Sequence, residues 1–94
     1  MFNLNKIDRK ILFDILSKFP FTFYAFGSRI TKNYKKFSDI DLYINENISD
    51  LDLFYLKEAC GDSNLSVKVD IKRIKDMSPE FFELIKEKAI LLIK

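Results

Sequence analysis

The sequence predicts a domain of the α/β (α+β) class, in which a small mixed β-sheet has helices packed on one face. Two observations predict it. Segments with apolar residues at helical spacing are interspersed with segments whose apolar residues are compact or alternate with polar ones, as in strands. Apolar residues also make up 48% of the 94 positions, which suffices for the core of a single domain over residues 1–94.

The first element that the sequence predicts is an amphipathic helix over residues 6–18. Its apolar residues recur at helical spacing. Asn5 is a suitable N-cap, Asp8 in the first turn complements the helix dipole, and Pro20 ends the helix. We therefore expect one face of this helix to pack on the sheet.

Two strands should follow this helix. Residues 21–26 are aromatic-rich and compact, as in a buried strand, and residues 28–36 should form a short helix or helical turn followed by a loop. Residues 38–45 alternate apolar and polar side chains. The apolar side chains of this second strand should therefore point to one face, and Asp39 and Asp41 to the other.

The second half of the chain continues with helices and a strand. A capping-box pattern begins a helix over about residues 50–60. Residues 66–72 should form a third strand of the same polarity, with Asp70 on the polar face. A final helix is expected from Ser78. Its expected apolar stripe is formed by Phe82, Ile85, Ala89 and Leu92.

Composition excludes several classes of protein and site. No stretch approaches the ~20 apolar residues that span a bilayer, and the charged start of the chain predicts no secretory signal. One cysteine and no histidine exclude an internal disulfide, a Cys/His zinc site and any triad that uses histidine. We expect a cytoplasmic protein without a membrane partner, in which catalysis depends on carboxylates, lysines, hydroxyls or a bound metal.

Charge is segregated along the chain. Residues 1–36 carry eight basic and two acidic residues, whereas residues 37–70 carry two basic and eight acidic ones. An acidic middle segment suits a site that gathers cations, and flanking lysines suit phosphate groups, although ordinary solvated surface explains most single lysines equally well.

Three aspartates lie at positions where a sheet would bring them together. Asp39 and Asp41 are two residues apart on one strand, so their like charges repel unless a cation lies between them. Asp70, on the next strand, should complete the cluster, and three carboxylates on an open face are a suitable site for Mg²⁺. Alternating aspartates alone are common in half-exposed strands, and a Gly-Ser pair is usually a turn, so the hypothesis depends on the combination.

The combination resembles the DNA polymerase beta-like nucleotidyltransferase superfamily. More closely, it resembles the minimal nucleotidyltransferases (MNT) of prokaryotic HEPN/MNT toxin–antitoxin pairs, over almost the whole chain. The segments that carry the resemblance are Gly27-Ser28-Arg29, Ser38-Asp39-Ile40-Asp41-Leu42 and Val69-Asp70-Ile71.

The resemblance implies a nucleotidyltransferase fold and a two-metal Mg²⁺ site formed by Asp39, Asp41 and Asp70, in which the last residue is a ligand or the base for the acceptor hydroxyl. ATP is the implied donor of AMP. The residues implied to contact the nucleotide are Gly27, Ser28, Arg29 and Lys35. Lys35 stands where arginine is frequent in the family, so it offers a phosphate a single positive charge in place of the two parallel hydrogen bonds of a guanidinium.

The resemblance also implies the acceptor of the AMP group. In the family resembled, the MNT protein is an antitoxin that transfers AMP to a tyrosine of its HEPN-family toxin, a ribonuclease. Two alternatives stay open: a non-catalytic antitoxin that binds and masks the toxin, and a nucleotidyltransferase of the antibiotic-modifying kind that acts on small molecules. Direct nucleic-acid binding is not expected, because the predicted cleft is acidic and no recognised nucleic-acid motif is present.

Overall fold

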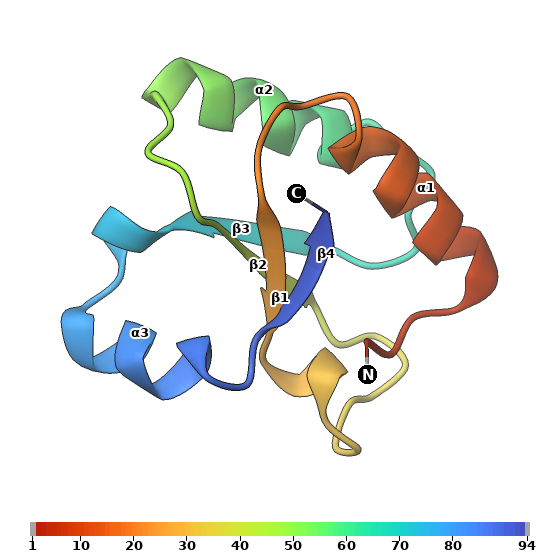
Figure 1. The fold of residues 1–94 in the computed structure, drawn as a ribbon. Coiled ribbons are helices and arrows are strands. Elements are labelled where there is room, and N and C mark those ends of the chain that lie inside the picture. The colour runs from red at the N-terminus through yellow and green to blue at the C-terminus, as the bar shows by residue number, and fades with distance from the viewer. Residues whose placement is uncertain (1, 94) are drawn as a thin grey trace.

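The computed structural model describes residues 2–93, which form one sheet and three α-helices (Figure 1). The helices are α1 (Lys6–Leu16), α2 (Asp50–Gly61) and α3 (Pro79–Lys86), with short 3-10 helices η1 (Ser28–Ile30) and η2 (Ile74–Asp76). The strands are β1 (Phe23–Phe26), β2 (Ile40–Ile44), β3 (Val69–Arg73) and β4 (Ile90–Ile93). In this part of the chain, the helices are too short or too polar to cross a membrane.

The four strands form a mixed sheet in the order β3-β2-β1-β4, and the predicted fold class is confirmed. Strands β2 and β3 run parallel and are joined through α2, whereas β1 is antiparallel to both β2 and β4. In this register Asp41 of β2 is the partner of Phe26 on one side and of Asp70 on the other. Direct partners share a face, so all three side chains leave the same side of the sheet.

The hydrophobic core lies between the opposite side of the sheet and the helices α1 and α2, as the alternation of apolar residues predicts. Its fully buried strand residues are Phe23, Ala25, Ile40, Leu42, Ile44 and Ile71, and its buried helix residues are Leu12, Leu16, Leu56 and Cys60. Asn5 caps α1 by accepting a hydrogen bond from the Asp8 amide over 2.8 Å, as expected.

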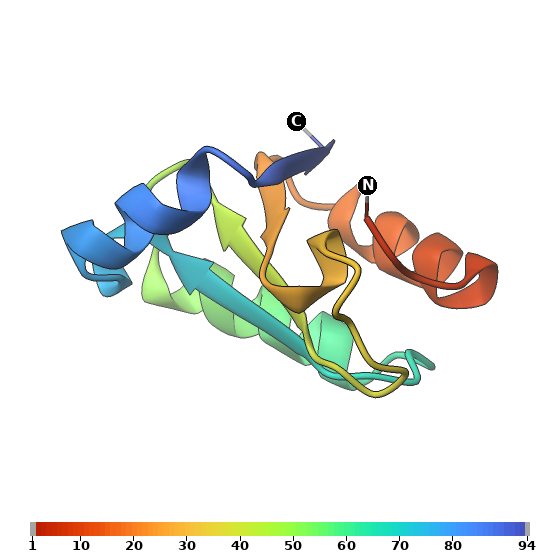
Figure 2. The ribbon, with the colours of Figure 1, turned by 90° about the horizontal axis from the view of Figure 1, so that it is seen from below.

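The third helix differs from the expectation of a single helical face. Figure 2 shows α2 and α3 on opposite sides of β2 and β3. The ring of Phe82 lies edge-on to Tyr43 with centroids 5.4 Å apart, and Phe81 lies edge-on to Phe26 at 5.9 Å. Phe26 and Tyr43 make one end of the aspartate face apolar, and α3 covers that end because the aromatic surface would otherwise meet water.

The end of the chain is also different from the prediction. The final helix stops at Lys86, and Ile90–Ile93 form β4 along the free edge of β1. Four consecutive apolar residues are compatible with a buried strand and with the apolar stripe of a helix. The strand forms because the edge of β1 has unpaired backbone N–H and C=O groups that can bond to it. The helical stripe predicted through Ala89 and Leu92 is therefore wrong.

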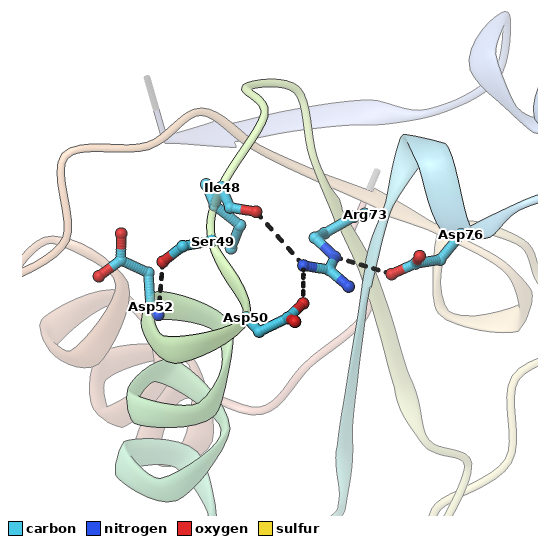
Figure 3. Close-up of polar contacts among 6 residues, drawn as sticks. All are labelled: Ile48, Ser49, Asp50, Asp52, Arg73 and Asp76. Atoms are coloured by element: carbon cyan, nitrogen blue, oxygen red, sulfur yellow. Dashed lines mark hydrogen bonds and ion pairs between the residues drawn. The ribbon is translucent and has the colours of Figure 1, made fainter.

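Polar contacts fix the start of α2 against the end of β3 (Figure 3). The Arg73 guanidinium donates through Nη1 to Asp50 Oδ1 at 2.6 Å and to the Ile48 carbonyl at 3.3 Å, and through Nε to Asp76 Oδ2 at 2.7 Å. The Ser49 hydroxyl caps α2, as the capping-box pattern predicts. Arg73 thereby joins α2, β3 and η2 at one point.

A buried carboxylate ties α1 to the segment that precedes β3. The side chain of Asp8, which is 3% exposed, accepts hydrogen bonds from the backbone amide of Ser66 at 3.1 Å and from the Ser66 hydroxyl. It also accepts one from the side-chain amide of Asn5 at 2.9 Å. The hydrogen bonds from Ser66 hold the pKa of Asp8 below its ordinary value. Asp8 therefore connects the first turn of α1 to the distant segment that precedes β3.

Candidate active site

The end of β1 lies directly against a carboxylate of β2. Because Phe26 is paired with Asp41, the next residue, Gly27, passes beside the Asp41 side chain. Gly27 has φ +82°, and a Cβ atom at this position would lie 2.5 Å from Asp41 Oδ2. Only glycine adopts this backbone conformation without strain and leaves this space open.

The structure brings two of the three predicted acids together on neighbouring strands. Asp41 and Asp70 are direct partners in the parallel pair β2–β3, on the face opposite the core. Asp39 immediately precedes β2 and is exposed, whereas Asp41 is half-buried. The acids are thus open to solvent on the part of the sheet that α3 leaves uncovered, and a ligand has access to them.

The pKa of Asp41 is raised above its ordinary value. Burial is the main cause, and the negative charges of Asp70 and then Asp39 add to it, while the charge of Lys72 acts in the opposite direction. The charges of Asp70 and Asp39 therefore disfavour ionisation of Asp41, and a bound cation would remove this electrostatic cost.

Lys72 is a residue of this face to which sequence reasoning assigned no role. Its Nζ atom lies 3.1 Å from Asp70 Oδ2, and the two side chains are 39% and 43% exposed. Over residues 2–93, no group of three or more aspartate, glutamate or cysteine side chains is arranged to hold a metal ion as the side chains stand. The alternation of residues 66–72 predicts Lys72 on the same face as Asp70, but alternation alone does not indicate the ion pair.

The 3-10 helix η1 begins at Ser28, directly after Gly27. Ser28 is half-buried, and its carbonyl accepts hydrogen bonds from the amide of Thr31 at 3.0 Å and from the Thr31 hydroxyl at 2.8 Å. These contacts close the turn that follows β1. They hold Ser28 next to the Gly27–Asp41 contact.

Arg29, which the resemblance implies as a nucleotide contact, is buried and bonded to backbone carbonyls. Its side chain is 4% exposed, and its guanidinium donates to the carbonyls of Ser38, Asn3 and Lys36, each at 3.0 Å. Three of its donors thus hold the loop between η1 and β2 against the start of the chain. The structure therefore gives Arg29 a structural task in this loop.

The loop that leads to Asp39 ends in a closed turn that includes Lys35. The Lys35 amide donates to the Ser38 hydroxyl at 2.9 Å, and the Ser38 amide donates to the Lys35 carbonyl at 3.0 Å. Lys35 itself is exposed, four residues before Asp39. The backbone of this lysine is therefore fixed in the turn that precedes Asp39, while its side chain stays accessible.

Comparison with known proteins gives the family. The family described as "Polymerase beta, Nucleotidyltransferase" matches residues 3–94. The chain belongs to this nucleotidyltransferase family. It is also 36% identical over 74 residues to a Haemophilus influenzae protein named "Probable protein adenylyltransferase MntA". That alignment covers 77% of this chain and 65% of the relative, so the chain spans about two thirds of that protein's length.

The chemistry of the three predicted acids fits Mg²⁺. Carboxylate oxygens are the ligands that this ion prefers, and the ionised form of Asp41, which the charges of Asp70 and Asp39 disfavour, would be stabilised by a divalent cation. The space beside Asp41 Oδ2, which a Cβ at Gly27 would fill, keeps that oxygen accessible. Asp39, Asp41 and Asp70 are the residues that would hold the ion.

Proposed function

We propose that the protein transfers AMP from ATP to a hydroxyl group of a protein. The observation that carries this proposal is the contact of Gly27 with Asp41, with Asp70 beside it on the next strand, in a chain of the nucleotidyltransferase family. The name of the relative, a probable protein adenylyltransferase, supports a protein as the acceptor.

Each acid has a role in this proposal. Asp39 and Asp41 would hold Mg²⁺, and Asp70, the register partner of Asp41 on the neighbouring strand, would complete the donor set. Bound there, Mg²⁺ would neutralise the triphosphate and the charge that develops at the α-phosphorus. Asp70 is also the group that we assign to receive the proton when the acceptor oxygen bonds to the α-phosphorus and pyrophosphate leaves. Its side chain is 43% exposed, which leaves it accessible to an incoming hydroxyl.

The remaining site residues position the nucleotide. Gly27 allows phosphate oxygens to approach the backbone where a larger residue would be in contact with Asp41. Ser28 offers a hydroxyl and an amide at the start of η1. Lys35 supplies a mobile positive charge from a fixed backbone position. Catalysis in this arrangement comes mainly from positioning and charge neutralisation, as is usual in phosphoryl transfer.

The acceptor that we propose is a tyrosine of a HEPN-family toxin, so that modification would silence the toxin and the protein would act as its antitoxin. The resemblance to MNT antitoxins supports this step, together with the relative's name. The exposed position of Asp39 supports a macromolecular acceptor, because a hydroxyl on a protein surface has access to a site that opens outward.

Radiolabelling tests the proposal. With α-labelled ATP, Mg²⁺ and a HEPN-type protein encoded beside this chain's gene, the wild type should label the partner, and Asp41→Asn should reduce labelling by about 100-fold or more. Asp62→Asn is the matched control, since this exposed aspartate at the end of α2 lies outside the site. An unlabelled partner that is nevertheless neutralised by Asp41→Asn would favour the non-catalytic antitoxin instead.

A further inference from the structure

One lysine faces the acids from within the site. Lys72 follows Asp70 by two residues on β3 and is the register partner of Tyr43, just as Asp70 is the partner of Asp41. The side chains of these residues therefore share the face on which the acids lie. Lys72 Nζ lies 3.1 Å from Asp70 Oδ2, within ion-pair distance.

The charge of Lys72 also acts on the neighbouring strand. It lowers the pKa of Asp41, opposing the effects of burial, Asp70 and Asp39, which raise it. Throughout residues 2–93, no other lysine or arginine forms an ion pair with any of these three acids. A single ammonium group thus partly neutralises two carboxylates that come from two strands.

A lysine in this position competes with a divalent cation. The ammonium group occupies one oxygen of Asp70 and repels a second positive charge brought close to it. Lys72 is 39% exposed and has a flexible four-carbon stem, so it can leave Asp70 when another anion is offered.

We propose that Lys72 is a tethered counter-ion of the acid cluster, which holds the place of the metal in the free protein and moves to the phosphates when a nucleoside triphosphate binds. This inference rests on the proposed function, because it assumes that a metal and a triphosphate meet at these acids. Lys72 therefore weakens metal binding to the free protein and strengthens the coupling between metal and nucleotide, which is reciprocal. It is a positioning residue of the site.

Metal binding without nucleotide tests the inference. Mn²⁺ binding to the full chain, measured by electron paramagnetic resonance, should be about three- to tenfold tighter in Lys72→Met than in the wild type. Lys68→Met is the matched control: it removes the same charge from an exposed position next to β3, and Lys68 forms no ion pair in the described chain. Lys72→Arg keeps the charge and should bind Mn²⁺ no more tightly than the wild type. Asp41→Asn should abolish binding, which locates the ion at this site.

A second measurement concerns the coupling. A non-hydrolysable ATP analogue should tighten Mn²⁺ binding more in the wild type than in Lys72→Met, because the variant has no ammonium group to transfer to the phosphates. In EDTA, Lys72→Met should unfold at a lower temperature than Lys68→Met, and Mg²⁺ should remove this difference.

The outcomes separate the two proposals. Equal changes in Mn²⁺ affinity in Lys72→Met and Lys68→Met, weaker binding in Lys72→Met, or binding that survives Asp41→Asn would overturn the role of Lys72 even if AMP transfer is observed. Tighter binding in Lys72→Met alone, with no protein acceptor labelled by any nucleotide, would support the counter-ion and reject the proposed transfer reaction.

Discussion

At the scale of single residues, the site depends on one backbone conformation and one carboxylate. Gly27 has a positive φ, and the Asp41 side chain leaves no space for a Cβ atom at this position. Asp41 is held half-buried near two other acids, so its ionised form is costly. A carboxylate whose ionised form is disfavoured in this way persists only where the rest of the fold holds it in place, and such groups are common where chemistry takes place.

Gly27→Ala should damage both stability and activity. The Cβ atom would collide with Asp41 Oδ2, and alanine tolerates φ +82° poorly, so we expect a loss of about 1–3 kcal/mol in the free energy of unfolding. Urea denaturation gives this value, and nucleotidyl transfer should fall with it at temperatures where the variant is still folded. Gly61→Ala is the control, because nothing lies within 4 Å of its Cβ position. If both substitutions are neutral, the close contact at Gly27 does not constrain the site.

Asp41→Asn should make the metal-free protein more stable at neutral pH. The pKa of Asp41 is raised in the folded state, so folding favours the protonated form. The stability that protonation supplies is present at pH values below the ordinary 3.8 and is lost as the pH rises through the raised pKa. The melting temperature of Asp41→Asn in EDTA should therefore exceed that of the wild type at pH 7 and approach it near pH 3.5. A lower melting temperature of the variant at pH 7 would contradict the repulsion among the acids.

At the scale of elements, loops and helix ends are held by polar groups that bond to the backbone. Arg29 fixes the loop between η1 and β2, and Arg73 fixes the start of α2 to β3. Neither role is visible in the sequence, because carbonyl acceptors are present at every residue and carry no sequence signal. Strand alternation, by contrast, is a local pattern, and it predicts that Asp39, Asp41 and Asp70 share one face.

Arg29→Lys should loosen the loop that leads to Asp39. The ammonium group of lysine lacks the planar array of N–H donors with which the guanidinium bonds three carbonyls at once. We therefore expect a loss of about 1–3 kcal/mol in the free energy of unfolding. Arg9→Lys is the control, since the exposed Arg9 donates to the Phe2 carbonyl alone. Chemical denaturation compares the two variants. Equal losses would show that the loop is held by other contacts.

At the scale of the whole molecule, the sheet has a packed face and a face that is both aromatic and acidic. The sequence predicted the packed face because its apolar residues alternate over five positions in β2. It did not predict that Phe26 and Tyr43 would need a cover on the other face, which places α3 there and leaves the acids uncovered beside it. Nor did it predict β4, because the pairing of Ile90–Ile93 depends on an edge formed by distant residues.

The pairing of β1 with β4 has a consequence for folding kinetics. Ala25 meets Ile90, so the strand that presents Gly27 finds one of its two neighbours near the opposite end of the described chain. Contacts between such distant segments close long loops and form late. The residues of the candidate site come from the end of β1, from β2 and from β3, so no short segment of the chain contains the site by itself. If this domain folds in one cooperative step, as small domains usually do, the acid cluster is assembled only in the native structure.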